Sequence, residues 1–353
     1  MVFGSKTRPL IGLDITTSSV KLVELGLAGG QYRVESYAAE PTPPNSINEK
    51  AIVDATAVGE AIKSAVKRAN ARAKDVAVAI SGDAAITKLI QMPKSLSPNE
   101  LEAQVELQAD QYIPFPMEEV SYDFEVIGPS EKDPEMVDVL LVATRTENVE
   151  QRIAACTAAG LTASIVDVEA FALENACRLL THQMPDGGLG RIVAVVDFGA
   201  SSTTFSVLRD LKVAYTRDFA FGGQQLTEEI MRTYGLSMEE AGRVKKEGGL
   251  PGNYQTEVLD PFIDDMCQQV SRSLQFFMAS GAGREQPEKI LVCGGCANIS
   301  GVAEVIASRV GIDTEKGDPL GQMKLSTKAK NQLVKRDATA LLTACGLALR
   351  SFD

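Results

Sequence analysis

The chain has 353 residues, of which 44% are hydrophobic, so it can bury the cores of about two domains and long disorder is not expected. Its formal net charge of −12 argues against a nucleic-acid-binding protein, and its single histidine, His182, argues against any site that needs several histidines. The polar residues before Leu10 predict no signal peptide, and no window is apolar enough to span a membrane. The six cysteines are expected to be reduced thiols in the cytoplasm.

An internal repeat is the most informative feature of the sequence. Residues 10–25 and residues 192–208 each read as an apolar strand, an aspartate, a short turn rich in hydroxyl side chains and a second apolar strand. The two aspartates, Asp14 and Asp197, are about half the chain apart. This spacing predicts a duplicated α/β half.

The elements between and after the repeats alternate between helical and strand periodicity, which predicts an α/β fold with largely parallel central strands. Ser97, Pro98 and Glu100 form the capping-box pattern that opens a helix. In chain order, we expect a helix over 51–73, a strand over 75–81, a helix over 97–112, strands over 122–128, 137–145 and 163–168, a helix over 169–181, a linker over 185–190, helices over 225–248 and 258–280, a strand over 289–293 and a helix over 336–350.

The repeated hairpins favour a phosphate-binding function. Backbone N–H groups in a tight turn bind anions, and aspartate oxygens suit Mg²⁺ or its water ligands. Two such hairpins facing each other would hold a polyphosphate from both sides. The turn at Gly294 and Gly295, which follows a buried strand, would let the backbone approach a nucleoside closely. Cys293 and Cys296 form a single C-x-x-C without a second pair, so they predict no metal site.

These hairpins, the Gly294-Gly295 turn and the helices beginning near Glu169 and Asp337 resemble the ATP-site segments of the actin, Hsp70 and sugar-kinase superfamily. The small α/β insertion is similar in position to the displaced subdomain of FtsA. Over its whole length the chain resembles the PilM family of type IV pilus machines, and the similarity is carried by residues 111–116, 165–170 and 345–353.

The resemblance implies an actin-like (ribonuclease H-like) duplicated fold, in which two lobes enclose a nucleotide cleft. Residues 1–85 and 161–184 would form the first core subdomain, residues 86–160 the inserted partner-binding subdomain, and residues 191–353 the second lobe, with 225–285 as its smaller subdomain.

The resemblance also implies ATP and Mg²⁺ as cofactors, with at most slow ATP hydrolysis. Asp14 and Asp197 would position Mg²⁺ through water, and Glu169 would orient the attacking water. The other implied nucleotide contacts are Thr16, Thr17, Ser18 and Lys21 in the first loop, Gly199, Ser201 and Ser202 in the second, and Lys245, Gly294, Gly295 and Ala297 around the nucleoside.

The implied partner is the N-terminal cytoplasmic peptide of the inner-membrane protein PilN, together with other inner-membrane and motor components of the pilus. The protein would then sit in the cytoplasm at the inner membrane through its partners, without inserting into the bilayer, in support of pilus biogenesis and twitching motility. The peptide groove would lie between the first core subdomain and the insertion. Its expected residues are Ile86, Leu89, Ile90, Met92, Gln104, Gln108, Tyr112, Ile113 and Phe115, although packing between subdomains would explain the apolar residues near Tyr112 equally well.

Two other functions fit the same fold: a kinase for a sugar or carboxylate, and a polymerising protein of the FtsA type. A further feature is open to two interpretations. Lys63, Lys67, Arg68, Arg72 and Lys74 lie opposite the apolar stripe of their helix, where they form either a solvated face or a docking face for an acidic partner.

Overall fold

Two sheets that share the order of five strands, with β16 (Lys324–Leu325) added at the edge of the first, form the framework of the molecule. The computed structural model describes residues 8–130, 133–281, 283, 285–329 and 332–353. The N-terminal segment 1–7, where the sequence predicts no signal peptide, lies outside the described residues. In each sheet an antiparallel meander of three strands is followed by two strands parallel to its first. The predicted internal repeat is therefore confirmed.

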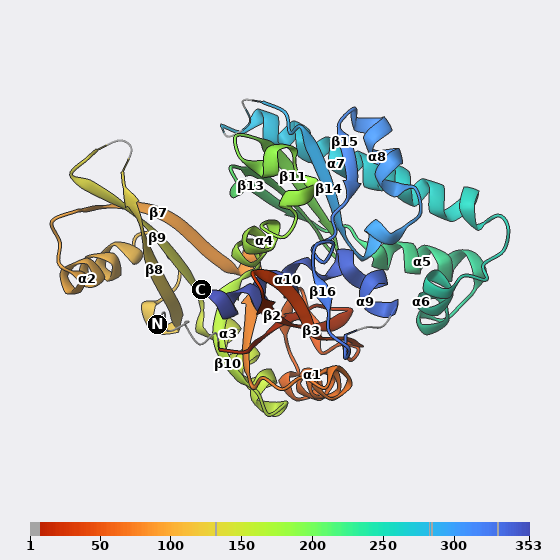
Figure 1. Cartoon of the computed structure of the whole chain (residues 1–353), viewed down its shortest axis with the longest axis horizontal. Helices are drawn as coiled ribbons and strands as arrows, with labels where there is room; N and C mark the ends of the chain where they lie inside the picture. Colours follow the sequence, from red (N-terminus) through yellow and green to blue (C-terminus); the bar gives the residue numbers. More distant parts are fainter. Residues whose placement is uncertain (1–7, 131–132, 282, 284, 330–331) are drawn as a thin grey trace.

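The first sheet has the order β10-β6-β1-β2-β3-β16 and the second the order β13-β12-β11-β14-β15. Their strands are β1 (Leu10–Ile15), β2 (Ser19–Ala28), β3 (Gln31–Pro41), β6 (Asp75–Ile80), β10 (Thr162–Val168) and β16 (Lys324–Leu325), and then β11 (Ile192–Phe198), β12 (Thr203–Arg209), β13 (Lys212–Phe219), β14 (Lys289–Gly294) and β15 (Asp313–Lys316). Each sheet forms the centre of one lobe, and Figure 1 shows the two lobes one above the other.

Helices cover both faces of the first sheet. On one face α1 (Ala55–Ala69) and α3 (Thr146–Ala158) pack over a fully buried core that includes Ile11, Leu13 and Ile62. On the other face α4 (Glu169–Cys177) and α10 (Leu342–Leu349) pack together and against β1. A Cβ atom at Gly12 would lie 2.0 Å from the carbonyl oxygen of Ala344, so α10 can approach β1 this closely only over a glycine.

The second lobe packs four helices around its sheet: α5 (Gly223–Tyr234), α6 (Met238–Glu247), α7 (Asp260–Ala279) and α8 (Val302–Val310). The single helix expected over 225–248 is two helices. Gly235 ends α5 in the left-handed conformation, with φ of 66°, and Ser237 with Glu240 forms a capping box that starts α6. The break turns α6 back against α5.

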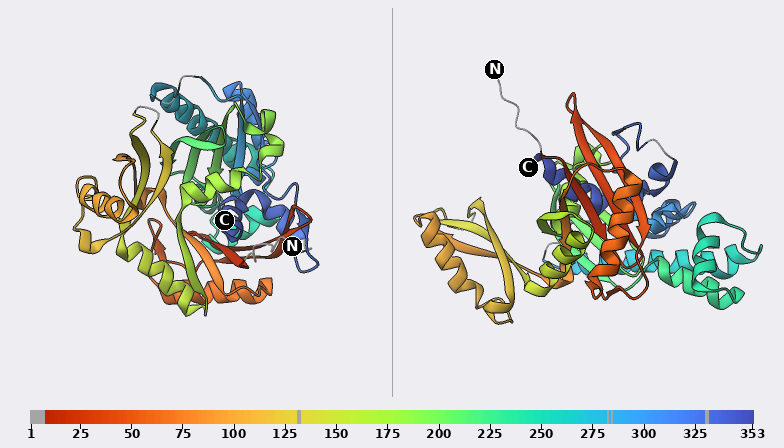
Figure 2. Two further views of the ribbon diagram at one scale, coloured as in Figure 1. Left: turned by 60° about the vertical axis from the view of Figure 1, so that its left-hand side comes forward. Right: turned by 90° about the horizontal axis from the view of Figure 1, so that it is seen from below.

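The insertion is a separate three-stranded sheet with one helix. Its strands β7 (Ala85–Pro93), β8 (Val120–Pro129) and β9 (Met136–Arg145) have the order β7-β9-β8, and α2 (Pro98–Ala109) packs on one face over its own apolar core. The predicted capping box at the start of α2 is present. Figures 1 and 2 show α2 on the side of this sheet away from the two lobes, so the uncovered face of the sheet is turned toward them.

The chain returns to the first lobe twice, which differs from the expected domain limits. Helix α3, at the end of the range expected for the insertion, packs against α1 and contributes Ala155 and Cys156 to the first-lobe core. The segment after residue 323, expected in the second lobe, adds β16 to the first sheet and places α9 (Gln332–Asp337) and α10 in the first lobe. Sequence periodicity gives the type of these elements but not the lobe on which they pack.

Candidate functional site

The turns of the two repeated hairpins meet at the interface between the lobes. The hydroxyl oxygen of Thr17, in the turn after β1, lies 3.2 Å from the hydroxyl oxygen of Ser201, in the turn after β11. These residues are 184 positions apart in the chain, and each stands at the carboxyl end of the first strand of its sheet. The structure thus brings together the two loops that the sequence singled out.

Each turn leaves backbone donors free. In the first, both the amide and the hydroxyl of Thr16 donate to the carbonyl oxygen of Ser19, at 3.0 and 2.9 Å, and in the second the Gly199 amide donates to the Ser202 carbonyl at 3.0 Å. The amides of Thr17, Ser18, Ala200 and Ser201 have no acceptor in the part of the chain that the structure describes. Facing turns with unpaired N–H groups are suited to an anion between them.

A glycine is required in the second turn. A Cβ atom at Gly199 would lie 2.7 Å from the carbonyl oxygen of Ser202, the oxygen that accepts the hydrogen bond of the Gly199 amide. The first turn has Thr16 at its start, and the hydroxyl of this threonine closes the turn. The two loops are therefore alike in path but closed by different groups.

Asp14 and Lys21 face each other across the first hairpin. They are paired residues of β1 and β2, and Lys21 Nζ lies 2.7 Å from Asp14 Oδ2, with both side chains largely buried. Burial by itself would lower the pKa of Lys21, but the carboxylates of Asp14, Asp197 and Glu169 raise it. Lys21 is therefore charged and held beside the two facing turns, within the field of all three predicted catalytic carboxylates.

Asp197 lies at the corresponding place on β11. Its pKa is raised to about 6, chiefly by burial; Asp14 and Asp218 contribute to the rise, and Lys21 opposes it. Gly294 packs against it from β14, where a Cβ atom would lie 2.5 Å from Asp197 Oδ1 and 2.2 Å from the Phe198 carbonyl. Gly294 also has φ of 84°, so this position needs glycine both for space and for backbone conformation.

A second lysine close to these carboxylates was not predicted from the sequence. Lys50, in the tight turn between β4 (Ile47–Asn48) and β5 (Ala51–Ile52), lies 3.0 Å from Asp218 Oδ2, 3.6 Å from Asp83 Oδ2 and 3.9 Å from Glu169 Oε2. Asp218 belongs to β13 of the second lobe, and Asp83 to the short turn that leads into the insertion. One ammonium group thus joins the two lobes and the base of the insertion.

Glu169 is the first residue of α4 and points into the same cluster. Its pKa is raised to about 7, chiefly by burial; Lys50 opposes the rise, while Asp14 and Asp218 contribute to it. Its side chain keeps 31% of its surface exposed, so water can reach it. A carboxyl group that titrates near neutral pH beside a cleft can accept a proton from a water molecule.

The residues expected around a nucleoside gather at one end of the second lobe. Lys245 Nζ donates to the carbonyl oxygen of Gly223 at 2.7 Å and to the Thr227 hydroxyl at 2.6 Å, and burial lowers the pKa of Lys245. Gly295 is exposed, with open space beyond its Cα. Ala297 has no exposed surface, and its side chain belongs to the second-lobe core, so its contact with a nucleoside stays a prediction.

The residues expected in the peptide groove do not form one surface. Ile90, Met92 and Ile113 are buried between the insertion sheet and α2, where they pack in the insertion core instead of facing a groove. Ile90 and Met92 alternate along β7 with Leu89, which is 61% exposed on the uncovered face of the sheet. The half-buried Gln104 and Gln108 belong to α2, on the opposite side of the sheet.

The remaining groove residues lie near the ends of these elements. Tyr112 is 40% exposed after α2, and Ile86 packs at the edge of the insertion core. The ring of Phe115 lies 4.2 Å below the guanidinium of Arg145. A groove facing the lobes would therefore be lined by Leu89 and its cross-strand neighbour Leu140 rather than by the whole predicted set.

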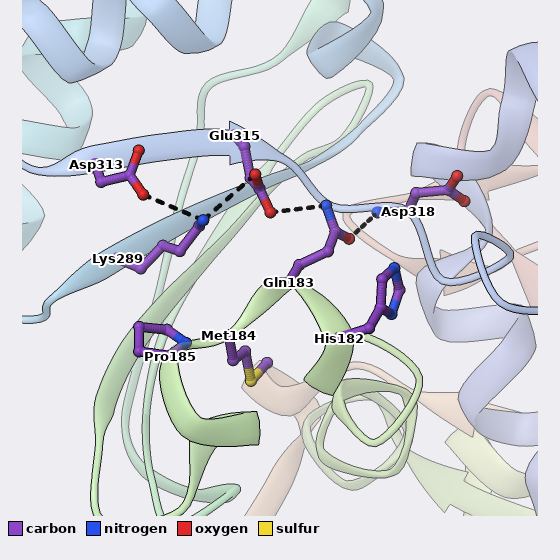
Figure 3. A pocket seen from close by; sticks show the side chains of 8 residues that line it. All are labelled: His182, Gln183, Met184, Pro185, Lys289, Asp313, Glu315 and Asp318. Carbon is purple, nitrogen blue, oxygen red and sulfur yellow. Dashed lines mark hydrogen bonds and ion pairs between the residues drawn. The ribbon is translucent and has the colours of Figure 1, made fainter.

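A wide hollow lies elsewhere, beside the edge strand β15 (Figure 3). It contains His182, whose Nδ1 lies 3.0 Å from the Leu179 carbonyl oxygen, and Lys289, which is ion-paired with Asp313 and Glu315. Its residues do not include any of the cleft carboxylates. Among the described residues, no group of three or more His, Cys, Asp or Glu side chains is placed to hold a metal ion, and no helix is long and apolar enough to cross a bilayer.

The family is decided by two comparisons. The model for "Type IV pilus assembly protein PilM" matches residues 12–352. The chain belongs to the PilM family. A solved structure titled "PilM-PilN type IV pilus biogenesis complex" matches 98% of this chain and 99% of its own chain, with 30% identity and a TM-score of 0.79. PilM proteins are components of type IV pilus biogenesis, as the sequence resemblance implied.

More distant similarities show the fold of this PilM-family chain. The ethanolamine utilization protein EutJ from Carboxydothermus hydrogenoformans has a TM-score of 0.55 over 96% of this chain and 88% of its own, with 16% identity. Cell division protein FtsA of Agrobacterium fabrum is 26% identical over 233 residues, which are 54% of this chain and 51% of FtsA. The chain thus spans about half the length of the curated relatives it matches. The predicted actin-like architecture of two lobes is confirmed.

Proposed function

We propose that the protein binds Mg²⁺-ATP between its lobes and acts as a nucleotide-controlled adaptor of the type IV pilus platform. The observation that carries this is the meeting of the two hydroxyl-rich turns, in which four backbone amides have no acceptor among the described residues. A triphosphate would lie between these turns, and Lys21 would supply a positive charge at their base.

The acidic groups of the cleft fit a hydrated magnesium ion that arrives with the nucleotide. Asp14 and Asp197 stand behind the two turns and would hold Mg²⁺ through its water ligands. The bound ion would supply charge neutralisation for the phosphates. Glu169 would accept the proton of a nearby water molecule. Its ion pair with Lys50 would make the carboxylate a weaker base for this step. This arrangement supports slow turnover at most.

Movement of the two lobes toward each other would change the position of the insertion through the contacts of Lys50. Its ammonium contacts Asp218 in the second lobe and Asp83 at the entrance to the insertion, so a shift between the lobes changes contacts at that entrance. The partner would be the N-terminal cytoplasmic peptide of PilN, held against the uncovered sheet face at Leu89. Such a partner would bring the protein to the cytoplasmic side of the inner membrane. There the protein would link the pilus platform to the motor components of the pilus.

The test measures binding of a synthetic PilN N-terminal peptide by fluorescence anisotropy, with and without saturating Mg²⁺-ATP. We expect the nucleotide to change the peptide affinity about fivefold or more, as a coupling of about 1 kcal/mol requires. Leu89→Asp should abolish binding, whereas Leu107→Asp, on the exposed outer side of α2, should not. Equal affinity in both nucleotide states would refute the control by nucleotide, and equal loss in the two variants would refute the peptide site.

A further inference from the structure

A strongly basic face lies on the first lobe of this acidic chain. The segments 67–74 and 324–336 contain four and five lysine or arginine residues and no aspartate or glutamate. They are about 250 residues apart in sequence, but the fold brings them together: β16 pairs with β3, and Lys328 Nζ donates to the carbonyl oxygen of Asn70 at 3.3 Å. We call the described residues of these two segments the basic face.

The basic face surrounds a small hollow with a polar floor. Arg68 from α1, Lys328 from the turn after β16 and Arg336 from α9 line it, together with Tyr37 of β3. The hydroxyl of Tyr37 donates to Asp337 at the floor. Arg68 also pairs with Glu40 at 2.8 Å and Arg336 with Asp337 at 2.9 Å. Three cations around two carboxylates leave the hollow with a net positive charge.

Most of the surrounding basic side chains have no ion-pair partner among the described residues. Lys67, Arg72, Lys74, Lys324 and Lys335 are exposed, and none of them forms an ion pair with another described residue. Helix dipoles explain part of the cluster. The last turn of a helix favours cations, and the last turns of α1 and α9 contain Lys67, Arg68, Lys335 and Arg336. Arg72, Lys74, Lys324 and Lys328 lie in loops or a strand, where no helix end favours a cation.

We propose that the basic face docks an acidic segment of a protein partner, with a carboxylate side chain seated among Arg68, Lys328 and Arg336. A concave site with an aromatic wall at Tyr37 fits a side chain better than a flat lipid surface does. Outside the two basic segments, the chain carries a more negative net charge than the −12 of the whole sequence. This negative charge opposes the approach of the protein to an anionic membrane. The acidic remainder also orients an acidic partner onto this one face.

The docking face is separate from the sites of the proposed function. It lies on the far side of the first lobe from the insertion in Figure 1, where α9 and β16 are at the opposite side from β7 and α2. None of its residues belongs to the carboxylate cluster of the cleft. An acidic partner could therefore bind while the cleft and the insertion are occupied.

The experiment uses the full chain and a fluorescein-labelled decaglutamate peptide as probe. Anisotropy titrations at low ionic strength compare wild type with the double variant Arg72→Glu/Lys328→Glu. The matched control, Lys88→Glu/Lys246→Glu, makes the same charge change at exposed positions on the insertion and the second lobe. We expect the first variant to bind at least about tenfold more weakly and the control to bind within about twofold of wild type. Circular dichroism melts confirm that both variants fold.

Three results would overturn the proposal. The first is no saturable binding of the peptide by wild type, and the second is an equal loss in both double variants, which would mean that only overall charge matters. The third concerns vesicles that contain phosphatidylglycerol. If wild type binds these vesicles and Arg72→Glu/Lys328→Glu abolishes that binding but leaves peptide binding unchanged, the basic face meets a membrane and not an acidic protein segment. Adding Mg²⁺-ATP should leave peptide affinity unchanged, so a failure of nucleotide binding does not affect this test.

Discussion

Replacing Glu169 by glutamine should change how the stability of the protein depends on pH. The pKa of Glu169 is raised from 4.5 to about 7, chiefly by burial, so the folded state binds its proton more tightly than the unfolded chain does. The stability that this group contributes is complete below its unfolded pKa and is lost as the pH rises through 7. A glutamine cannot ionise, so the variant lacks this loss.

The size of the effect follows from the shift. A change from 4.5 to about 7 corresponds to about 3 kcal/mol, and solvent screening of a side chain that is 31% exposed reduces our expectation to about 2 kcal/mol. Between pH 4.5 and 8, wild type should therefore lose about 2 kcal/mol of unfolding free energy relative to Glu169→Gln.

Urea unfolding at several pH values measures this difference directly. Glu174→Gln is the matched control, because Glu174 lies on the same helix but pairs with Lys212 outside the carboxylate cluster. The control should run parallel to wild type across the range. If wild type and Glu169→Gln also run parallel, Glu169 is not a desolvated member of the cluster and the account of the cleft is wrong at its centre.

Four further substitutions test the packing and the charges. Ile90→Ala should destabilise the protein by about 3 kcal/mol because Ile90 is buried in the insertion core. In the same urea titration, Leu89→Ala should change the free energy of unfolding by less than about 0.5 kcal/mol. Equal effects of the two substitutions would contradict the assigned faces of β7. Lys50→Met should cost about 2 kcal/mol by removing the partner of Asp218, and an unchanged midpoint would show that the lobes are not held there. Gly294→Ala should lower thermal stability by about 3 kcal/mol, since its Cβ atom would meet the Phe198 carbonyl; a normal melting curve would contradict that contact.

The sequence predicted the two facing hairpin turns because their pattern is local and occurs twice. Asp14 and Asp197 each end an apolar strand and precede a hydroxyl-rich turn, so a short stretch of sequence contains the whole signal. The equal strand order of the two sheets follows from the same repeat. The type of most helices and strands was also predictable from periodicity and from capping residues such as Ser97 and Glu100.

The parts that could not be predicted depend on contacts between distant segments. Lys50 and Asp218 meet across the lobes, and neither has a neighbouring residue that marks it as part of a site. A strand alternates between two faces, but its pattern does not say which face a helix covers, so Ile90 and Met92 were assigned to a groove although α2 buries them. The return of α9 and α10 to the first lobe is likewise a property of tertiary packing.

The most direct test of the central claim is the thermal unfolding of the purified protein with and without excess Mg²⁺-ATP, for wild type, Asp197→Ala and the exposed control Glu304→Ala. Nucleotide at about a hundred times its dissociation constant should stabilise wild type by about 2.7 kcal/mol, a shift of about 2–4 °C for a chain of this size. We predict that Glu304→Ala keeps this shift and that Asp197→Ala loses it. The absence of any shift in wild type at millimolar Mg²⁺-ATP, or an undiminished shift in Asp197→Ala, would contradict a nucleotide site between the two loops.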